Sequence, residues 1–363
     1  MAESAGKLVA AIPLSAALLL GACSSAPPRE PPVDPDAARA EMRAHIPPAV
    51  ADREAWVSDI LAAFEALAVR PDSHNICAVT AVIQQESGFQ VDPVVPGLPA
   101  MARREIDARA ARYHIPDALV NLALNTHSPD GRTYAERLQQ AKTERALSDM
   151  FEDFIGSVPL GRQLFADLNP VRTGGPMQVS IAFAESQVKT KSYPYPLADG
   201  IRHEVFTRRG GLYFGIAHLL DYPVTYDSML YRFADFNAGH YASRNAAFQR
   251  AVSSLSGKQL AIDGDLLREG SNEPSQTELA VRKLGTGLSE HQIRRDLEKG
   301  TEHAFEETDL YRKVFELADA RGLAPRELVP GIRLQSVKII RKLTTDWYAH
   351  RVDDRYRSCL QGR

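Results

Sequence analysis

The spacing of apolar residues along the chain is typical of a helical protein. Over residues 74–87, Ile76, Val79, Val82 and Ile83 recur at intervals of three or four residues and so fall on one side of a helix. The same spacing, or a run of good helix formers, predicts further helices at Val57–Leu67, Asp117–Leu124, Tyr134–Asp153, Gly211–Leu220, Met229–Ala234, Asp309–Arg321 and Gly331–Trp347. Sustained alternation of apolar and polar residues is scarce, so we expect a mainly α fold.

Capping and turn residues delimit these helices. Asp72 or Ser73 would cap the start of the helix over residues 74–87, and Gly88 suits the left-handed position that ends a helix. Clusters of glycine, proline, asparagine and serine predict loops at Asp92–Pro99, Asn169–Pro176 and Gly264–Pro274.

One carboxylate continues the apolar side of the first helix. Glu86 lies three residues after Ile83 and four after Val82, so it points in the same direction as the buried residues. Loss of hydration and the negative end of the helix dipole both disfavour the ionised form, which predicts a raised pKa for Glu86. A carboxylic acid that is protonated near neutral pH can serve as a general acid in glycoside cleavage. The alternative is a glutamate that turns to solvent and pairs with a nearby Arg or Lys.

The first 22 residues have the pattern of a secretory signal peptide. Lys7 precedes an apolar run over residues 8–20, which is too short to span a bilayer. The following Leu20-Gly21-Ala22-Cys23 resembles the lipobox of bacterial lipoproteins, which implies cleavage before Cys23 and attachment of lipid, such as palmitate, there. The two serines after Cys23 favour the outer membrane. The alternative is an ordinary secreted protein in which Cys23 is incidental.

Residues 23–49 are rich in proline and predict a semi-rigid linker between the lipid and a folded part over residues 50–363. The other two cysteines, Cys77 and Cys359, would lie in an oxidising compartment. A disulfide between them would tie the C-terminus to the helix that carries Glu86. Two buried free thiols are the alternative, because a sequence does not report their separation.

Composition and charge exclude several other classes of function. A chain of 363 residues can form one large domain or two smaller ones, and its net charge of −3 gives no basic surface for nucleic acid. The histidines lack the spacing of metal ligands, and no nucleophile elbow or phosphate-binding loop occurs. We therefore expect no metal and no organic cofactor.

Five short patterns occur in a fixed order along the chain. They are Glu86-Ser87-Gly88-Phe89, Gly174-Gly175-Pro176-Met177-Gln178, Gly211–Leu220, Phe236-Asn237-Ala238-Gly239 and Glu307-Thr308-Asp309-Leu310-Tyr311. Together they resemble the lysozyme-like lytic transglycosylases, whose pattern is E-S-x-F, G-L-M-Q, a helix with a glycine and a tyrosine, Y-N-A-G and E-T-x-x-Y. The resemblance covers roughly residues 72–90 and 172–315.

The resemblance implies a lysozyme-like helical domain that cleaves peptidoglycan glycan strands. Glu86 would protonate the bond between N-acetylmuramic acid and N-acetylglucosamine and then act as a base. The substrate's own acetamido group and C6 hydroxyl would complete the reaction and leave a 1,6-anhydromuropeptide, without the second carboxylate that most glycosidases use. The lipid on Cys23 would place this enzyme at the inner leaflet of the outer membrane, facing the periplasm.

The resemblance also implies substrate contacts in the remaining motifs. The residues concerned are Ser87, Gly175, Met177, Gln178, Tyr213, Phe236, Asn237, Tyr241, Glu307 and Tyr311. Gln178 would offer amide hydrogen bonds to the sugar, and Glu307 and Tyr311, four residues apart, would share a helical face. Each motif also has a purely structural interpretation as a turn, a helix end or a surface helix with one core anchor.

The chain departs from the family pattern in three respects. A helical insertion over about residues 95–170 separates the first two motifs, and a helical extension over about residues 316–363 follows the last. Phe236 stands where the family has a tyrosine whose hydroxyl lies near the catalytic glutamate, so Tyr241 or Tyr213 would have to supply that hydrogen bond.

Two other functions stay open at this point. The protein could be a non-catalytic lipoprotein that binds glycan strands or acts as a scaffold for other wall enzymes. It could also be a hydrolytic muramidase in which Asp92, Asp199 or Asp235 positions a water molecule.

Overall fold

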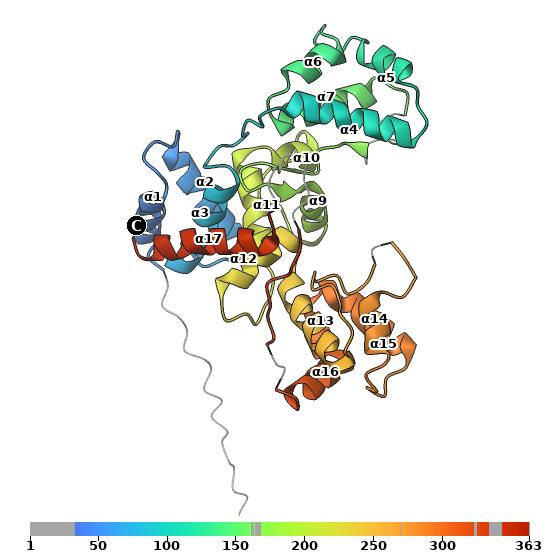
Figure 1. Ribbon diagram of the computed structural model, residues 1–363. Helices are drawn as coiled ribbons and strands as arrows, with labels where there is room; N and C mark the ends of the chain where they lie inside the picture. The colour runs from blue at the N-terminus through green and yellow to red at the C-terminus, as the bar shows by residue number, and fades with distance from the viewer. Residues whose placement is uncertain are drawn as a thin grey trace, which may run out of the picture. The chain divides into compact units, whose positions relative to one another are not determined.

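The computed structural model describes residues 33–160, 163, 168–268, 270–322, 325–333 and 343–362 (Figure 1). This part of the protein is mainly α-helical, as the sequence predicts. The predicted signal peptide and Cys23 lie outside the described residues. Within the described ranges, no helix is long and apolar enough to cross a membrane.

The main hydrophobic core is built by helices from both ends of the chain. Its elements include α1 (Pro35–His45), α2 (Arg53–Ala66), α3 (Ser73–Glu86), α9 (Ile181–Thr190), α10 (Gly200–Val205), α11 (Arg208–Leu220), α12 (Met229–Ala238) and α17 (Thr345–Leu360). Buried residues of the insertion, among them Met101, Leu124 and Leu147, belong to the same cluster. The helix α11 is buried without interruption from Gly210 to Ala217, which explains why its sequence lacks a polar face.

The first helix corrects the predicted linker. Residues 35–45 form α1, capped by Asp34, and its Met42 and the following Ile46 are fully buried against α2 and α3. The folded part therefore begins near residue 35 and not at residue 50. The two apolar anchors lie four residues apart, a helical spacing that the proline content of the segment masked.

The described residues of the predicted insertion form four helices. These are α4 (Leu98–Arg112), α5 (Asp117–Leu124), α6 (Tyr134–Gln140) and α7 (Glu144–Gly156). The sequence predicted a single helix over Tyr134–Asp153, but the chain breaks after Gln140, and Thr143 caps α7 by accepting a hydrogen bond from the Ala146 backbone. A two-stranded antiparallel sheet of β1 (Thr173–Gly174) and β2 (Val179–Ser180) follows the insertion.

A second hydrophobic core lies in the later part of the chain. It involves α13 (Ala242–Ser256), α14 (Gln276–Val281), α15 (Glu290–Glu298), the 3-10 helices η2 (Lys299–Thr301) and η3 (His303–Glu307), and α16 (Asp309–Asp319). Its apolar centre contains Phe248, Phe305 and Phe315. The predicted helices at Asp117–Leu124 and Asp309–Arg321 match α5 and, within two residues, α16.

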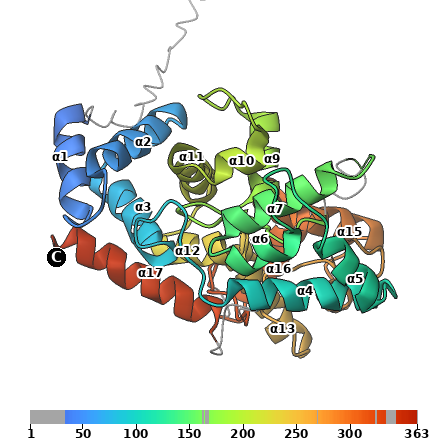
Figure 2. The same cartoon turned by 90° about the horizontal axis from the view of Figure 1, so that it is seen from above.

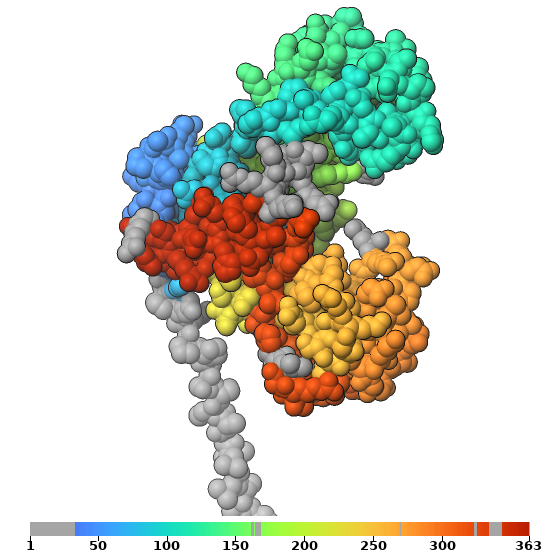
Figure 3. All heavy atoms as spheres, viewed as in Figure 1, coloured from blue at the N-terminus to red at the C-terminus, as the bar shows by residue number. Residues whose placement is uncertain are grey.

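The C-terminal helix is not an extension of the fold. Its contacts with α12 and with α3 are the two most extensive between described elements, and Figures 1 and 2 both show α17 lying along α3. Figure 3 shows the outer side of α17 at the molecular surface. The helix predicted over Gly331–Trp347 is wrong at its described ends, because Arg333 and Thr344 form a β-bridge and α17 starts only at Thr345.

A disulfide between Cys77 and Cys359 joins α17 to α3, so of the two alternatives that the sequence left open the bonded one is present. Cys77 is fully buried in α3, and the Thr80 hydroxyl lies 3.9 Å from the sulfur of Cys359. The bridge closes a loop with a sequence separation of 282 residues, so it restricts almost the whole chain in the unfolded state.

We expect the double variant Cys77→Ala, Cys359→Ala to lose about 2–5 kcal/mol of unfolding free energy, because its unfolded chain is no longer closed into a loop. Urea unfolding under oxidising conditions measures this loss. Dithiothreitol should lower the unfolding free energy of the native protein by a similar amount and leave that of the double variant unchanged. Equal stability of the two proteins without reductant would contradict the prediction.

Candidate active site

Glu86 accepts a hydrogen bond from the C-terminal helix. The hydroxyl of Tyr348 lies 2.5 Å from Oε1 of Glu86, and Tyr348 is buried while Glu86 is half-buried at the last residue of α3. Burial and the neighbouring Glu86 carboxylate both raise the pKa of Tyr348 well above its ordinary value. Tyr348 therefore keeps its proton and acts as the donor to the carboxylate.

The same turn of α17 also contacts Asn237. Thr345 lies three residues before Tyr348 and donates a hydrogen bond from its hydroxyl to Oδ1 of Asn237, at 2.9 Å. Residues three apart share a face of a helix, so one face of α17 contacts the end of α3 and the end of α12. Two of the motif residues, Glu86 and Asn237, are thereby linked through one helical turn.

The disulfide and the Tyr348 hydrogen bond join α3 and α17 at two distant points. Glu86 lies nine residues after Cys77, and Tyr348 lies eleven residues before Cys359. At a rise of about 1.5 Å per residue, these two intervals are about 13 Å and about 16 Å long. The two helices therefore run in broadly opposite directions, with one cross-link near each end of the shared length.

The end of α3 is shaped by two consecutive left-handed residues. Asp72 caps the start of the helix by accepting from the Asn75 backbone, as predicted. After Glu86, Gly88 has φ of 59° and Phe89 has φ of 62°, a conformation that costs a non-glycine residue free energy. The ring of Phe89 packs edge-on against Trp56 with centroids 5.4 Å apart, and this contact holds the turn after Glu86.

The second motif forms the hairpin of β1 and β2 and packs tightly against α11. Gly175 has φ of 73°, and a Cβ there would lie 2.2 Å from the backbone oxygen of Val205. A Cβ on Gly215 of α11 would lie 2.5 Å from both the Cβ and the sulfur of Met177. Gly175 is therefore needed for the close approach of the hairpin to the end of α10, and Gly215 for its approach to α11.

Met177 and Gln178, predicted to contact substrate, differ in their surroundings. Met177 is fully buried against α11 and therefore belongs to the core, as does Gly175. Gln178 is half-buried with φ of 50°, and its amide donates to the Gly175 oxygen at 3.3 Å. Ser87 is buried, and its hydroxyl donates to the Ile83 oxygen at the end of α3.

Neither tyrosine proposed to replace the motif hydroxyl contacts Glu86 through a hydrogen bond in the described structure. Tyr213 is buried, and its hydroxyl donates to the Ser192 oxygen at 3.3 Å. Tyr241 is buried under the guanidinium of Arg244, which lies 4.3 Å from its ring centroid. Both predictions are therefore corrected, because burial assigns these rings to packing.

The last motif belongs to the second core. Glu307 is exposed at the end of η3, and Tyr311 is buried in α16 against Phe305 and Phe315. The two residues were predicted to share a helical face, but the Thr308 cap between them starts a new helix. Tyr311 is therefore a core residue of the second cluster.

A buried carboxylate next to the fourth motif, that of Asp235, binds the backbone that follows this motif. Phe236 is nearly buried, and Asn237 after it is exposed. Asp235 is fully buried and accepts hydrogen bonds from the hydroxyls of Tyr222 and Tyr226 and from the backbone of Tyr241 and Ser243. Burial raises the pKa of Asp235, and these donors act in the opposite direction.

Two groups of residues bear on metal binding. His218 is packed against Phe183 and Phe236, and burial lowers its pKa to about 3, so it is neutral near pH 7. The side chains of His45, Cys77 and Cys359 lie within 4.8 Å of one another, but both sulfurs belong to the disulfide and offer no thiolate.

A family described as "Protein of unknown function (DUF1615)" matches residues 49–362. The chain belongs to this family. It is also similar to the uncharacterized protein YaiW of Escherichia coli (strain K12), with 52% identity over 362 residues that cover 97% of this chain and 98% of the relative. No solved structure matches the chain. The family description and the relative's name assign no reaction.

Sequence reasoning missed Tyr348 and Thr345 because both fall near or within a helix placed too early in the chain. The available signal was the disulfide. Once Cys359 is paired with Cys77, a helix that runs back from Cys359 comes opposite Glu86 after three turns, which is where Tyr348 lies.

We expect Gly215→Ala to destabilise the protein by about 1–3 kcal/mol. The added methyl group meets the Met177 Cβ, which cannot move without shifting the hairpin backbone. This cost exceeds the gain of about 1 kcal/mol that alanine normally brings to a helix interior. Thermal or urea unfolding measures the change, and a more stable variant would contradict the close packing.

Proposed function

We propose that the protein is a peptidoglycan lytic transglycosylase in which Glu86 is the general acid and then the base. The proposal includes a lipid anchor on Cys23 and a location at the inner leaflet of the outer membrane, facing the periplasm. The observation that carries the reaction is the hydrogen bond from Tyr348 to Glu86, beside the contact of Thr345 with Asn237.

This arrangement supplies the feature that the motif comparison lacked. Phe236 has no hydroxyl to offer the glutamate, whereas Tyr348 donates to Glu86 from another helix. A hydroxyl bonded to one carboxyl oxygen fixes the orientation of the carboxyl group, which general-acid catalysis requires. Glu86 is half-buried at a helix end, so it keeps contact with solvent from which a glycan strand can approach.

Backbone strain supports a functional reading of three motifs. Non-glycine residues with positive φ are uncommon, and Phe89, Gln178 and Tyr241 have φ of 62°, 50° and 65°. The first two belong to the first and second sequence patterns, and Tyr241 lies two residues after the fourth; four further described non-glycine residues with positive φ lie outside the patterns. Strained positions tend to cluster at functional sites, where the surrounding packing maintains them.

The surroundings of Asp235 and Asp199, two of the three aspartates that could position water, support transglycosylation over hydrolysis, and Asp92 is half-buried. A hydrolytic enzyme of the inverting type needs a second carboxylate that can activate water. Asp235 is already occupied by four donors in the core, and Asp199 is exposed beside His203. The substrate's acetamido group and C6 hydroxyl would then complete the reaction that Glu86 starts.

We expect Glu86→Gln to lower the release of anhydromuropeptides from purified sacculi by at least about a hundredfold, because the amide cannot transfer a proton. Mass spectrometry of the released muropeptides measures this. The matched control is Glu65→Gln, the same change at an exposed position near the end of α2, and it should retain native activity.

Each product pattern distinguishes one of the candidate functions. Reducing ends from the native protein would indicate a hydrolytic muramidase. No product from either protein, although both sediment with sacculi, would indicate a glycan-binding or scaffolding lipoprotein. Native release by Glu86→Gln would show that Glu86 is not the acid.

We expect Tyr348→Phe to lower kcat/KM by about 10- to 100-fold, because a hydrogen bond to a charged group contributes about 1.5–3 kcal/mol. Removal of the Tyr348 hydroxyl also disfavours the ionised form of Glu86. The alkaline limb of the pH–rate profile should therefore shift to higher pH by about one unit. Tyr356→Phe is the control, because Tyr356 lies on the same helix and bonds His74.

The control separates catalysis from folding. Tyr356→Phe removes a hydroxyl from α17 that does not contact Glu86, so its pH–rate profile should remain native. A lowered rate with an unmoved profile in Tyr348→Phe would assign Tyr348 to folding alone.

A further inference from the structure

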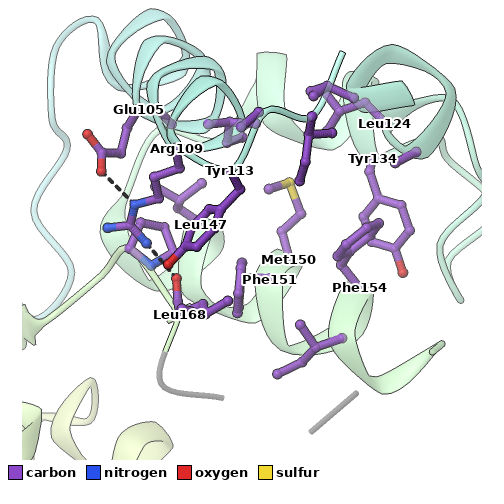
Figure 4. A pocket seen from close by; sticks show the side chains of 18 of the residues that line it. Glu105, Arg109, Tyr113, Leu124, Tyr134, Leu147, Met150, Phe151, Phe154 and Leu168 are labelled. Atoms are coloured by element: carbon purple, nitrogen blue, oxygen red, sulfur yellow. Dashed lines mark hydrogen bonds and ion pairs between the residues drawn. The ribbon is translucent and has the colours of Figure 1, made fainter. Parts of the chain in front are cut away.

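The insertion contains an apolar cavity that the proposed reaction does not use. Helices α4, α5 and α7 surround a volume of about 800 Å³, with Leu124, Leu147, Met150 and Phe154 among the side chains that line it (Figure 4). Ligand sites of proteins usually have volumes of about 300–1,000 Å³ and mainly apolar walls. The cavity therefore has the size and lining of a site for an apolar ligand.

The cavity continues into apolar side chains that are exposed to solvent. Tyr113, Ile115 and Leu119 line it and are 69%, 44% and 55% exposed. Exposed apolar side chains that form one continuous area mark binding sites more often than isolated ones do. The entrance is thus apolar as well, which favours a ligand with a long hydrocarbon part.

The charged residues at this cavity are mostly cationic. Arg109 and Arg112 line it, and among the described lining residues the one carboxylate is that of Glu105. Glu105 is bound by Arg109 at 2.6 Å, whereas the Arg112 guanidinium lies 3.8 Å away and its side chain is 69% exposed. The excess of positive charge favours a ligand with an anionic head group.

One buried polar group of the cavity wall lacks a partner. Tyr134 lines the cavity and is 1% exposed, and within the described structure its hydroxyl has no hydrogen-bond partner. A buried hydroxyl without a partner is costly, so such groups are usually satisfied by water or a ligand. Figure 4 shows Tyr134 on the side of the cavity opposite Arg109, so its hydroxyl does not bear on where a charged head group would lie.

From these observations we propose that the insertion binds the acyl chain of an anionic amphiphile, either a fatty acid or an anionic phospholipid. The hydrocarbon chain would fill the space around Met150, and the acidic group would lie by Arg112. This proposal does not depend on the reaction assigned to Glu86, so each can fail without the other.

The test is direct binding of palmitate. Residues 33–363 form one compact unit that contains both hydrophobic cores, so the protein without its first 23 residues is suitable. Isothermal titration calorimetry should give one palmitate per protein. Each buried methylene favours binding about fourfold, so laurate, with four fewer, should bind at least tenfold more weakly. Hexadecanol, which has no charge, should also bind more weakly than palmitate.

Three variants locate the ligand. Ala123→Trp fills the cavity from α5 and should weaken palmitate binding at least tenfold. Arg112→Glu reverses a charge at the cavity and should weaken it about fivefold. Arg104→Glu makes the same change at an exposed position of α4 outside the cavity lining, and should bind palmitate as the native protein does. Circular dichroism melts verify that each variant is folded.

Some outcomes of these experiments identify the ligand, and others contradict the proposal. Extraction of phosphatidylglycerol from vesicles, with weak binding of free palmitate, would identify a phospholipid as the source of the chain. The reverse would identify a fatty acid. The proposal would be overturned if neither palmitate nor phosphatidylglycerol bound, or if all three variants bound palmitate as well as the native protein does. It would also be overturned if only an amphipathic helical peptide saturated the site. If Ala123→Trp does not fold, the comparison of Arg112→Glu with Arg104→Glu still decides.

Discussion

The pairing of α3 with α17 is the constraint on which the proposed active site depends. Glu86 has its hydroxyl donor only because a helix from the end of the chain lies beside the helix that carries it. A disulfide fixes one end of this pair, and the Tyr348 hydrogen bond joins the helices about three turns further along α17. Because Thr345 and Tyr348 are both buried, α17 cannot shift along its axis without breaking contacts with both α3 and α12. The contacts of α17 with α3 and α12 thus fix the position of the hydroxyl that orients the Glu86 carboxyl group, as preorganised catalysis requires.

The same pairing explains why the long excursions of the chain need not disturb the site. The main core is closed by α1 to α3 on the N-terminal side and by α17 on the C-terminal side, and α11 lies buried within it. Helices α4 to α7 follow the turn at Phe89 and contribute buried residues such as Met101 and Leu147 to this core, whereas α13 to α16 have a hydrophobic cluster of their own. A long insertion between two elements that are already fixed costs little additional free energy, because the entropy cost of closing a loop grows only slowly with loop length.

Local signals in the sequence sufficed for part of this structure. The apolar stripe and the Asp72 cap define α3, and the position of Glu86 at its end follows from the same residues. The cysteines gave the disulfide as one of two alternatives. The function of α17 could not be predicted in this way, because its packing depends on residues more than 250 positions away in the chain. The motif tyrosines were misassigned for a related reason. Tyr213 and Tyr241 lie near the motifs in sequence, but burial of their rings by distant side chains decides where their hydroxyls point.

The region around Glu86 and the insertion, to which we assign different functions, differ in how much apolar surface they expose to solvent. Around Glu86, apolar side chains of α3 and α12 are buried, and Tyr348 is buried between them. Among the described residues of the insertion, seven large apolar side chains are exposed, namely Tyr113, Ile115, Leu119, Leu122, Val158, Leu160 and Leu168. Exposed apolar area forgoes roughly 25 cal/mol per Å² of stabilisation, so a fold that maintains it in one region gives up stability there. Binding of an apolar ligand would recover that stabilisation, whereas a purely structural insertion would gain nothing from its exposure. The physical difference between the regions thus matches a rigid catalytic site in one and an adaptable apolar site in the other.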